Sequence, residues 1–96
     1  MNNIRFEWDN TKNINNIKKH KISFEETKTV FFDENARVIP DPEHSKSEER
    51  FIILGISNKL KLLIVVHTYR KNDEVIRIIT ARKATKTESK YYLEVK

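Results

Sequence analysis

The sequence predicts an α+β fold in which two amino-terminal helices come first, an antiparallel meander of about four strands follows, and one helix ends the chain. Three observations predict this class. Helix-capping residues occur near both ends of the chain, and runs rich in β-branched residues, separated by turn residues, lie between them. The 96 residues are 38% hydrophobic and 34% charged, which supplies apolar surface for one small core. We therefore expect residues 1–96 to form a single domain.

The first helix is expected from about residue 10 to residue 20, because Asp9 can accept a hydrogen bond from the free N–H groups of its first turn. Ile14 and Ile17 lie about one turn apart and are expected to face inward. Asn13, Asn15 and Asn16 lower the helix propensity of the segment, so packing of the isoleucines should stabilise it. Two aromatic core candidates precede the helix: Phe6 and Trp8.

Capping patterns predict the other two helices. Ser23 and Glu26 form a capping box, in which each side chain can accept a hydrogen bond from the backbone N–H of the other residue. The helix that follows should run to about residue 32, and its apolar residues are expected to face the core: Phe24, Val30, Phe31 and Phe32. Thr85 and Glu88 repeat the pattern and predict the final helix. Its apolar and aromatic residues are Tyr91, Tyr92, Leu93 and Val95.

The strands are expected between the second and the last helix. The first is a brief strand that ends at Pro40 and Pro42, because proline interrupts the hydrogen bonding of a sheet. Short runs of turn residues separate the later strands and predict two successive hairpins. The longest strand is apolar on both faces at its middle, so we expect it to be central and covered on both sides. The four predicted strands are residues 36–39, 51–56, 60–69 and 75–82.

Composition excludes several classes of site. The chain has no cysteine, so it cannot form a disulfide or a thiolate zinc site, and its three histidines, His20, His44 and His67, lack the spacing of metal ligands. The single glycine, Gly55, rules out a glycine-rich phosphate loop. The first residues lack the apolar core of a signal peptide, and no apolar run reaches the roughly 18 residues of a membrane span. We expect a cytoplasmic protein without a metal or cofactor.

The net positive charge is confined to the last 36 residues of the chain. Residues 61–96 hold nine basic and four acidic residues, and residues 1–60 hold ten of each, so the second segment carries the whole net charge of +5. Within it, Arg77, Arg82 and Lys83 lead into the last helix, whose free N–H groups favour an anion. Strand parity places Arg77 and Arg82 on opposite faces, so only one should face a given cleft. The pattern favours a polyanion; alternatively, both arginines lie on a solvated surface and pair with acids.

Residues 41–50 concentrate charged groups directly before a predicted strand. His44 titrates near neutrality, Glu49 could act as a base if it were desolvated, and Arg50 could bind a phosphate through its planar guanidinium. The alternative is that the segment is a solvated acidic loop, in which Glu49 and Arg50 form an exposed ion pair of small value.

Three other ionisable residues have competing interpretations. Arg70 either forms a basic rim with Arg77 and Arg82 or pairs across the hairpin with Asp73 or Glu74. His20 is expected to interact with the carbonyl end of the first helix, and the alternative is a catalytic role. His67 lies within an apolar strand and is expected to be a hydrogen-bonded, half-buried residue, and the alternative is a proton carrier.

Five segments of the chain form a combined pattern: Phe6-Glu7-Trp8-Asp9, Lys19-His20-Lys21-Ile22-Ser23-Phe24-Glu25-Glu26, His44-Ser45-Lys46-Ser47-Glu48-Glu49-Arg50, Gly55-Ile56-Ser57 and Arg77-Ile78-Ile79-Thr80-Ala81-Arg82-Lys83-Ala84-Thr85. This combined pattern resembles the BrnT toxin family, and the match covers nearly the whole chain in the order of the family. One residue departs from it: Lys21 stands where the family usually has glycine after the histidine, so Lys21 must adopt a left-handed conformation or the helix must end differently.

The resemblance implies a ribonuclease toxin of a bacterial type II toxin–antitoxin system, with a fold like that of RelE-type toxins. It also implies a BrnA-like antitoxin with a ribbon-helix-helix domain, in a complex of two toxins and two antitoxins that represses its own operon. Operator DNA would then be bound only through the antitoxin. The implied reaction needs no metal, because the 2′-hydroxyl of RNA attacks the adjacent phosphorus while a base and an acid move protons.

Each candidate residue has a hypothetical role in this reaction. Arg82 and Arg50 would bind the scissile phosphate, and His44 or Glu49 would transfer protons. Flanking RNA would contact Lys83, Arg70 and Arg77. Two alternatives of other classes remain: a binding module that docks an acidic antitoxin segment or nucleic acid without catalysis, and a protein that supplies only a subunit interface. Direct reading of DNA by this chain is not expected, since no helix combines an exposed basic face with the layout of a recognition helix.

Overall fold

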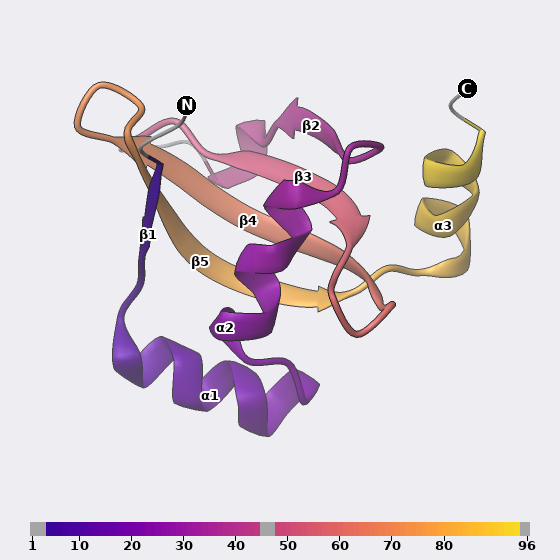
Figure 1. The fold of residues 1–96 in the computed structure, drawn as a ribbon, viewed down its shortest axis with the longest axis horizontal. Helices are drawn as coiled ribbons and strands as arrows, with labels where there is room; N and C mark the ends of the chain where they lie inside the picture. The colour runs from indigo at the N-terminus through magenta and orange to yellow at the C-terminus, as the bar shows by residue number, and fades with distance from the viewer. Residues whose placement is uncertain (1–3, 45–47, 95–96) are drawn as a thin grey trace.

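The computed structural model describes residues 4–44 and 48–94. Five strands form one sheet in the order β1-β5-β4-β3-β2, with α1 and α2 together on one side and α3 apart at the end where β5 finishes (Figure 1). The strands are β1 (Arg5–Glu7), β2 (Arg37–Pro40), β3 (Phe51–Ile56), β4 (Leu62–Arg70) and β5 (Val75–Lys83). The helices are α1 (Asn10–His20), α2 (Phe24–Thr27), α3 (Lys86–Leu93) and two 3₁₀ segments, η1 (Lys28–Phe32) and η2 (Pro42–His44). The predicted α+β class is confirmed.

The sheet is mixed, so the prediction of an antiparallel meander of about four strands was incomplete. β2, β3, β4 and β5 are antiparallel neighbours, but β1 pairs in parallel with the first residues of β5. β1 has only three residues, which is too short for an alternating apolar pattern to be visible. Its partner strand is also about 70 residues away in the sequence, so local signals carry no information about the pairing.

Both faces of β4 are covered at its middle, as predicted. α2 and η1 help to enclose the main core on one face, which we call the packed face. Its central residues are Ile22, Phe24, Val30, Ile53, Leu63, Val65, Ile78 and Ala81. A smaller cluster on the other face joins α3 to the sheet through Leu54, Ile64 and Tyr92. The predicted start of this strand at Leu60 was two residues too early, because Leu60 has a φ of 61° and lies in the preceding turn.

The inward orientation predicted for the isoleucines of α1 was wrong. Ile14 and Ile17 are 46% and 40% exposed, whereas Asn16 between them is only 6% exposed. The Asn16 amide donates to the carbonyl of Ile22 at 2.9 Å, and its Oδ1 accepts the backbone N–H of Ala81 at 3.1 Å. α1 therefore packs against β5 through a hydrogen-bonded asparagine, which a search for apolar periodicity passes over.

The first two helices begin at the predicted capping residues, but the second differs from the prediction in its length and helix type. Asp9 accepts the N–H of Lys12 at 3.1 Å, and Lys21 takes the left-handed conformation at φ 62° to donate to the carbonyl of Ile17 at 2.8 Å. The second helix differs in type, since α2 becomes the 3₁₀ segment η1 after one turn. Its predicted capping box is half formed: the hydroxyl of Ser23 accepts from Glu26, but the Glu26 carboxylate accepts from Ser57 at 2.7 Å instead. The apolar residue Phe32, at the end of η1, is 73% exposed and lies outside the core.

α3 is held to the sheet by a complete capping box and by a buried tyrosine. Thr85 and Glu88 exchange both predicted hydrogen bonds. The hydroxyl of Tyr92 donates to Asp33 at 2.7 Å, and Asp33 also accepts the N–H of Ile56 at 2.8 Å. Burial and the Asp33 contact raise the pKa of Tyr92 to about 12. Within the described part of the chain, no helix is long and apolar enough to cross a membrane.

Candidate functional site

All six arginines of the chain lie on one face of the sheet, opposite the packed face. Residues that pair directly across neighbouring strands share a face. Arg37 pairs with Leu54, and Arg82 pairs with Ile64; both apolar partners belong to the cluster under α3. We call this surface the arginine face, and its members are Arg5, Arg37, Arg50, Arg70, Arg77 and Arg82.

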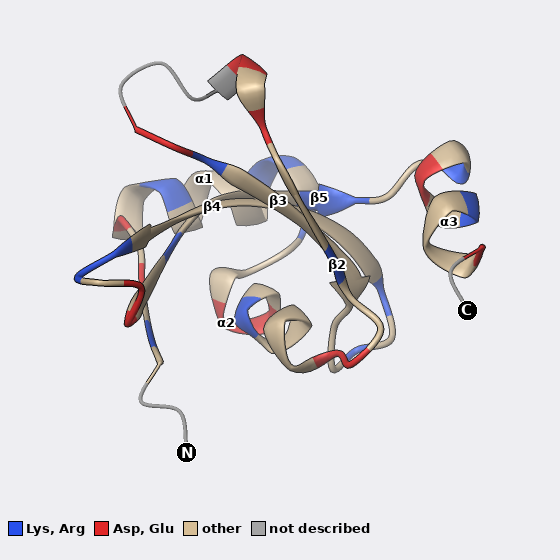
Figure 2. Ribbon diagram, turned by 90° about the horizontal axis from the view of Figure 1, so that it is seen from above, with Lys and Arg blue, Asp and Glu red and all other residues tan. Residues whose placement is uncertain are grey.

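The remaining pairings place the other arginines on the same face. Arg77 pairs with Thr68 of β4, and Arg70 lies two residues beyond Thr68. Arg50 directly precedes the pair formed by Phe51 and His67, so the antiparallel register carries it opposite Thr68. β1 contributes the remaining arginine at the same parity as its last residue, which pairs with Arg77. Segments coloured for basic residues lie along β2, just before β3 and at the end of β5 (Figure 2).

A β-bulge brings Arg77 and Arg82 to the same face, so the prediction that they point in opposite directions was wrong. Val66 pairs with Thr80 and the next residue of β4 pairs with Ile78, which leaves Ile79 as an extra residue in β5. One extra residue reverses the alternation of side chains beyond it. The bulge therefore adds Arg82 to the face that already carries Arg77.

Arg50 and Arg82 line one cavity of about 310 Å³ on the arginine face. Its lining also includes four apolar residues, two acidic residues, Asp41 and Glu43, and Thr80. The complete lining is Asp41, Glu43, Arg50, Ile52, Ile64, Val66, Ile79, Thr80 and Arg82. Two guanidinium groups beside a small concave surface can bind one tetrahedral anion, because each presents several N–H donors in a plane.

The guanidinium of Arg82 is fixed in place by the first turn of α3. Its two terminal nitrogens donate to the two carboxylate oxygens of Glu88, both at 2.9 Å, and one also donates to the carbonyl of Lys83 at 3.2 Å. The Arg82 contact is the largest cause that holds the pKa of Glu88 at about 2, and the same pair raises the pKa of Arg82. Because Glu88 also accepts the N–H of Thr85 at 2.8 Å, the orientation of Arg82 is tied to the start of the helix.

The other candidate arginines form a chain of ion pairs. Arg77 contacts Glu7 at 2.9 Å, and Glu7 contacts Arg70 at 3.8 Å. Arg70 reaches Glu48 at 3.3 Å, and Glu48 reaches Arg50 at 3.4 Å. Arg70 therefore pairs with acids outside its own hairpin, and Arg50 contacts Glu48. Exposed pairs of this kind add little stability, about 0–1 kcal/mol each, so a polyanion can replace the carboxylates.

The structure places only one of the two predicted proton carriers. Glu49 lines a separate hollow of about 690 Å³ beside Phe51 and Arg70. His44 ends the 3₁₀ segment η2, directly after Glu43 of the cavity lining, but its side chain lies outside the described part of the structure. Lys83 is exposed and pairs with Leu63 of the packed face, so it does not join the arginine face.

His67 is hydrogen-bonded, as expected, but it is buried more deeply than the half-buried position that the sequence predicts. It is fully buried against Phe31, Phe51 and Tyr69. The carbonyl of Val65 can only accept, so Nδ1 donates to it at 3.4 Å and Nε2 accepts from the Tyr69 hydroxyl at 3.3 Å. Burial lowers the pKa of His67 to about 4, so the ring is neutral at pH 7.

This buried histidine predicts that the protein loses stability in mild acid. Between the unfolded pKa of 6.5 and the folded pKa of about 4, only the unfolded chain binds the proton. The stability that the neutral His67 contributes to the folded state is therefore fully present above pH 6.5, and it is lost as the pH falls toward 4. We expect the free energy of unfolding to fall by about 2 kcal/mol from pH 7 to pH 5 through this group. Urea unfolding of wild type and of His67→Gln at both pH values measures it, since an equal fall in both proteins would contradict this assignment.

Sequence reasoning missed two contributors to the site. Asp41 was treated as part of a polar loop, but it is only 5% exposed and its N–H donates to the carbonyl of Arg50 at 2.9 Å, which extends the β2–β3 ladder. Glu88 was identified only as a capping residue, although its carboxylate also holds Arg82. Glu88 lies six residues after Arg82 and just inside a helix, and this position was the sequence signal that could have indicated their contact. Among residues 4–44 and 48–94, no three His, Asp or Glu side chains are grouped closely enough to hold a metal ion.

Comparison with known proteins identifies the family and supports the fold of this chain. The family model described as "Ribonuclease toxin, BrnT, of type II toxin-antitoxin system" matches residues 8–88. A crystal structure of the Brucella abortus ribonuclease toxin BrnT is similar to this chain with a TM-score of 0.66 and 25% sequence identity, over 86% of this chain and 99% of that chain. No curated protein matches the sequence. Because the family model spans most of the chain, this protein belongs to the BrnT family of ribonuclease toxins of type II toxin–antitoxin systems.

Proposed function

We propose that this toxin cleaves RNA without a metal ion, on the arginine face, at the cavity between Arg50 and Arg82. The observation that carries the proposal is the segregation of all six arginines on one sheet face, with two of them lining one cavity. Arginine suits this role better than lysine, since its planar group binds phosphate oxygens in pairs and stays charged.

In the proposed reaction, the ribose 2′-oxygen forms a bond to the adjacent phosphorus, and the bond from phosphorus to the 5′-oxygen of the next nucleotide breaks. A base takes the 2′-hydroxyl proton, and an acid protonates the departing oxygen. Arg50 and Arg82 stabilise the additional negative charge on the phosphate oxygens. The products are a 2′,3′-cyclic phosphate and a 5′-hydroxyl, so the step needs no water and no redox partner.

We assign proton transfer to η2 in preference to Glu49. Glu43 of this segment lines the same cavity as Arg50 and Arg82, and His44 follows it in the chain. Glu49 remains a candidate only if bound RNA extends into the neighbouring hollow. Arg70 and Arg77 continue the arginine face beyond the cavity and would contact flanking phosphates, whereas Lys83 would contact RNA only around the edge of β5.

The chemistry of the product ends tests the proposal. We expect purified toxin to cleave a labelled RNA in the presence of EDTA and to leave 5′-hydroxyl and cyclic or 3′-phosphate ends. A matched substrate with a single 2′-deoxynucleotide at the cut position should resist cleavage there, because the attacking oxygen is missing. Mass spectrometry of the fragments identifies the ends. Fragments with 3′-hydroxyl and 5′-phosphate ends, or activity that disappears in EDTA and returns with Mg²⁺, would contradict the mechanism.

We further propose that the antitoxin of this system is BrnA-like, with a ribbon-helix-helix domain, and forms a complex of two toxins and two antitoxins. Family membership supports the existence of an antitoxin partner. Operator DNA would contact the antitoxin and not this chain. Light scattering of the co-expressed pair, with and without operator DNA, gives the masses that test the stoichiometry.

A further inference from the structure

β2 is an edge strand whose outer side is not paired within the described structure. Its inner side pairs with β3, and the N–H of Asp41 donates to Arg50 in the same ladder. Backbone groups along an antiparallel strand point alternately toward and away from the partner strand. Ile39 therefore points its N–H and carbonyl toward β3, while Val38 points its own toward solvent. Pro40, which has no N–H, lies at another outward position, where it leaves the β2–β3 ladder intact.

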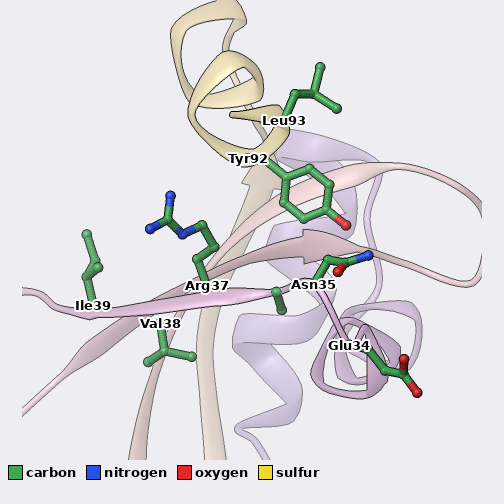
Figure 3. A pocket seen from close by; sticks show the side chains of 8 residues that line it. Glu34, Asn35, Arg37, Val38, Ile39, Tyr92 and Leu93 are labelled. Atoms are coloured by element: carbon green, nitrogen blue, oxygen red, sulfur yellow. The ribbon is translucent and has the colours of Figure 1, made fainter. Parts of the chain in front are cut away.

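Apolar side chains gather along this open edge. Val38 and Ile39 are 47% and 42% exposed, and Leu93 of α3 is 64% exposed. They line a hollow of about 500 Å³, whose other residues are Glu34, Asn35, Ala36, Arg37 and Tyr92. Figure 3 shows Arg37 and Ile39 on the side of β2 that faces α3, with Val38 on the opposite side. An extended chain placed along this edge would therefore meet an apolar side chain on each side of the strand.

This edge is continuous with the candidate catalytic cavity. Arg37 and Ile39 also line a second, largely apolar hollow of about 290 Å³ under α3, and Arg82 lines that hollow as well. The Arg37 guanidinium lies 4.1 Å from the ring centre of Tyr91 and donates to the Tyr91 carbonyl at 3.4 Å. No carboxylate contacts Arg37 among the described residues. A cation beside an apolar groove favours a polypeptide that carries both apolar residues and a carboxylate.

We propose that an extended segment of the antitoxin adds to the sheet as a strand beside β2. Its backbone would pair with the outward groups of Val38 and Pro40. Its apolar side chains would contact Val38 on one side of β2 and the hollow beside Ile39 and Leu93 on the other, and an acidic residue would contact Arg37. The antitoxin would thereby lie against Arg82, and this position gives it a route to block the substrate. The inference rests on the proposed toxin function, because it requires an antitoxin partner. Strand addition of this kind derives affinity from main-chain hydrogen bonds and specificity from alternate side chains.

A proline at position 38 tests the proposal. Val38→Pro removes the outward N–H without removing a hydrogen bond between β2 and β3, whereas Val38→Thr keeps both the N–H and the shape of the side chain. The probe is the antitoxin encoded beside this toxin, purified and titrated by calorimetry. We expect Val38→Pro to weaken binding at least tenfold and Val38→Thr to stay within about threefold of wild type, since lost strand pairing removes main-chain hydrogen bonds. Circular dichroism establishes that both variants are folded.

Cleavage of free RNA separates this inference from the proposed function. Val38 lies outside the catalytic cavity, so Val38→Pro should cleave RNA at the wild-type rate. If wild type does not cleave RNA, the proposed function fails, and the antitoxin titration still decides the interface. If Val38→Pro loses cleavage while it remains folded, the edge binds RNA and the inference is overturned. If wild type forms a dimer without antitoxin and Val38→Pro does not, the edge binds a second copy, which also overturns it.

Amide exchange in wild type gives a second test that needs no variant. In the free toxin the N–H of Val38 should exchange rapidly, whereas that of Ile39, which pairs with β3, should exchange slowly. On addition of antitoxin, exchange at Val38 should slow at least tenfold and exchange at Ile39 should change little. If the amide of Val38 exchanges at the same rate in the free toxin and in the complex, the proposal is wrong.

Discussion

Replacement of Arg82 by alanine should reduce the rate of RNA cleavage about 100- to 1,000-fold, the usual cost of removing one charge-stabilising donor from an active site. Arg82 lines the cavity with Arg50, and Glu88 fixes its orientation through two hydrogen bonds of 2.9 Å. A donor that is already oriented does not need to be ordered when the transition state forms. Arg82→Lys should recover only a small part of the lost rate, since lysine keeps the charge but lacks the paired donors.

The measurement is single-turnover cleavage of a labelled RNA in EDTA. Lys12→Ala serves as the matched control, because it removes one positive charge from an exposed position of α1 in the part of the fold that covers the packed face. It should cleave at close to the wild-type rate. A folded Arg82→Ala protein with full activity would remove Arg82 from the mechanism. Equal losses in Arg82→Ala and Lys12→Ala would instead indicate a general effect of net charge on RNA binding.

Replacement of Asn16 by leucine should lower the free energy of unfolding by about 4 kcal/mol, because it leaves two buried backbone groups without a partner at about 1–3 kcal/mol each. The groups are the carbonyl of Ile22 and the N–H of Ala81, both of which bond to the Asn16 amide. Leucine has a similar size, so the loss reports the hydrogen bonds rather than a cavity. Urea unfolding at pH 7 and 25 °C measures the difference.

Asn15→Leu is the matched control for this prediction. It makes the same chemical change one residue earlier in α1, where the side chain is exposed. We expect a change within about 0.5 kcal/mol, as for most surface substitutions. If the two variants unfold at the same urea concentration, the Asn16 hydrogen bonds do not determine the stability of the contact between α1 and β5.

The sequence identified most elements because their signals are local. Asp9, Ser23 and Thr85 each accept the backbone hydrogen bond expected of a cap, and the later strands lie close to their predicted bounds. Two features could not be predicted in this way. β1 depends on a partner about 70 residues distant, and the bulge at Ile79 depends on how β5 aligns with β4. Both are properties of pairing between strands and not of either strand alone.

The candidate site was predicted in part. Arg50 directly precedes a predicted strand, and Arg82 lies at the end of another. Because both are arginines, they were expected to converge on one phosphate, and both line one cavity. The position of all six arginines on one face could not be predicted, because simple alternation places Arg77 and Arg82 on opposite faces and the bulge cannot be seen in the sequence. The contact between Glu88 and Arg82 was not predicted, because the capping box already accounted for an acidic residue at position 88. A residue that satisfies one local rule can also serve a second purpose that only the tertiary structure reveals.

The two borders of the sheet differ in a way that limits how molecules can assemble. On the β5 side, β1 covers only three residues, and the side chain of Asn16 occupies the N–H of Ala81 beyond it. A chain arriving there finds little free backbone, whereas β2 on the opposite border offers its outward groups. We expect this asymmetry to favour addition of a strand at β2 over addition at β1, which disfavours head-to-tail stacking of sheets between native molecules.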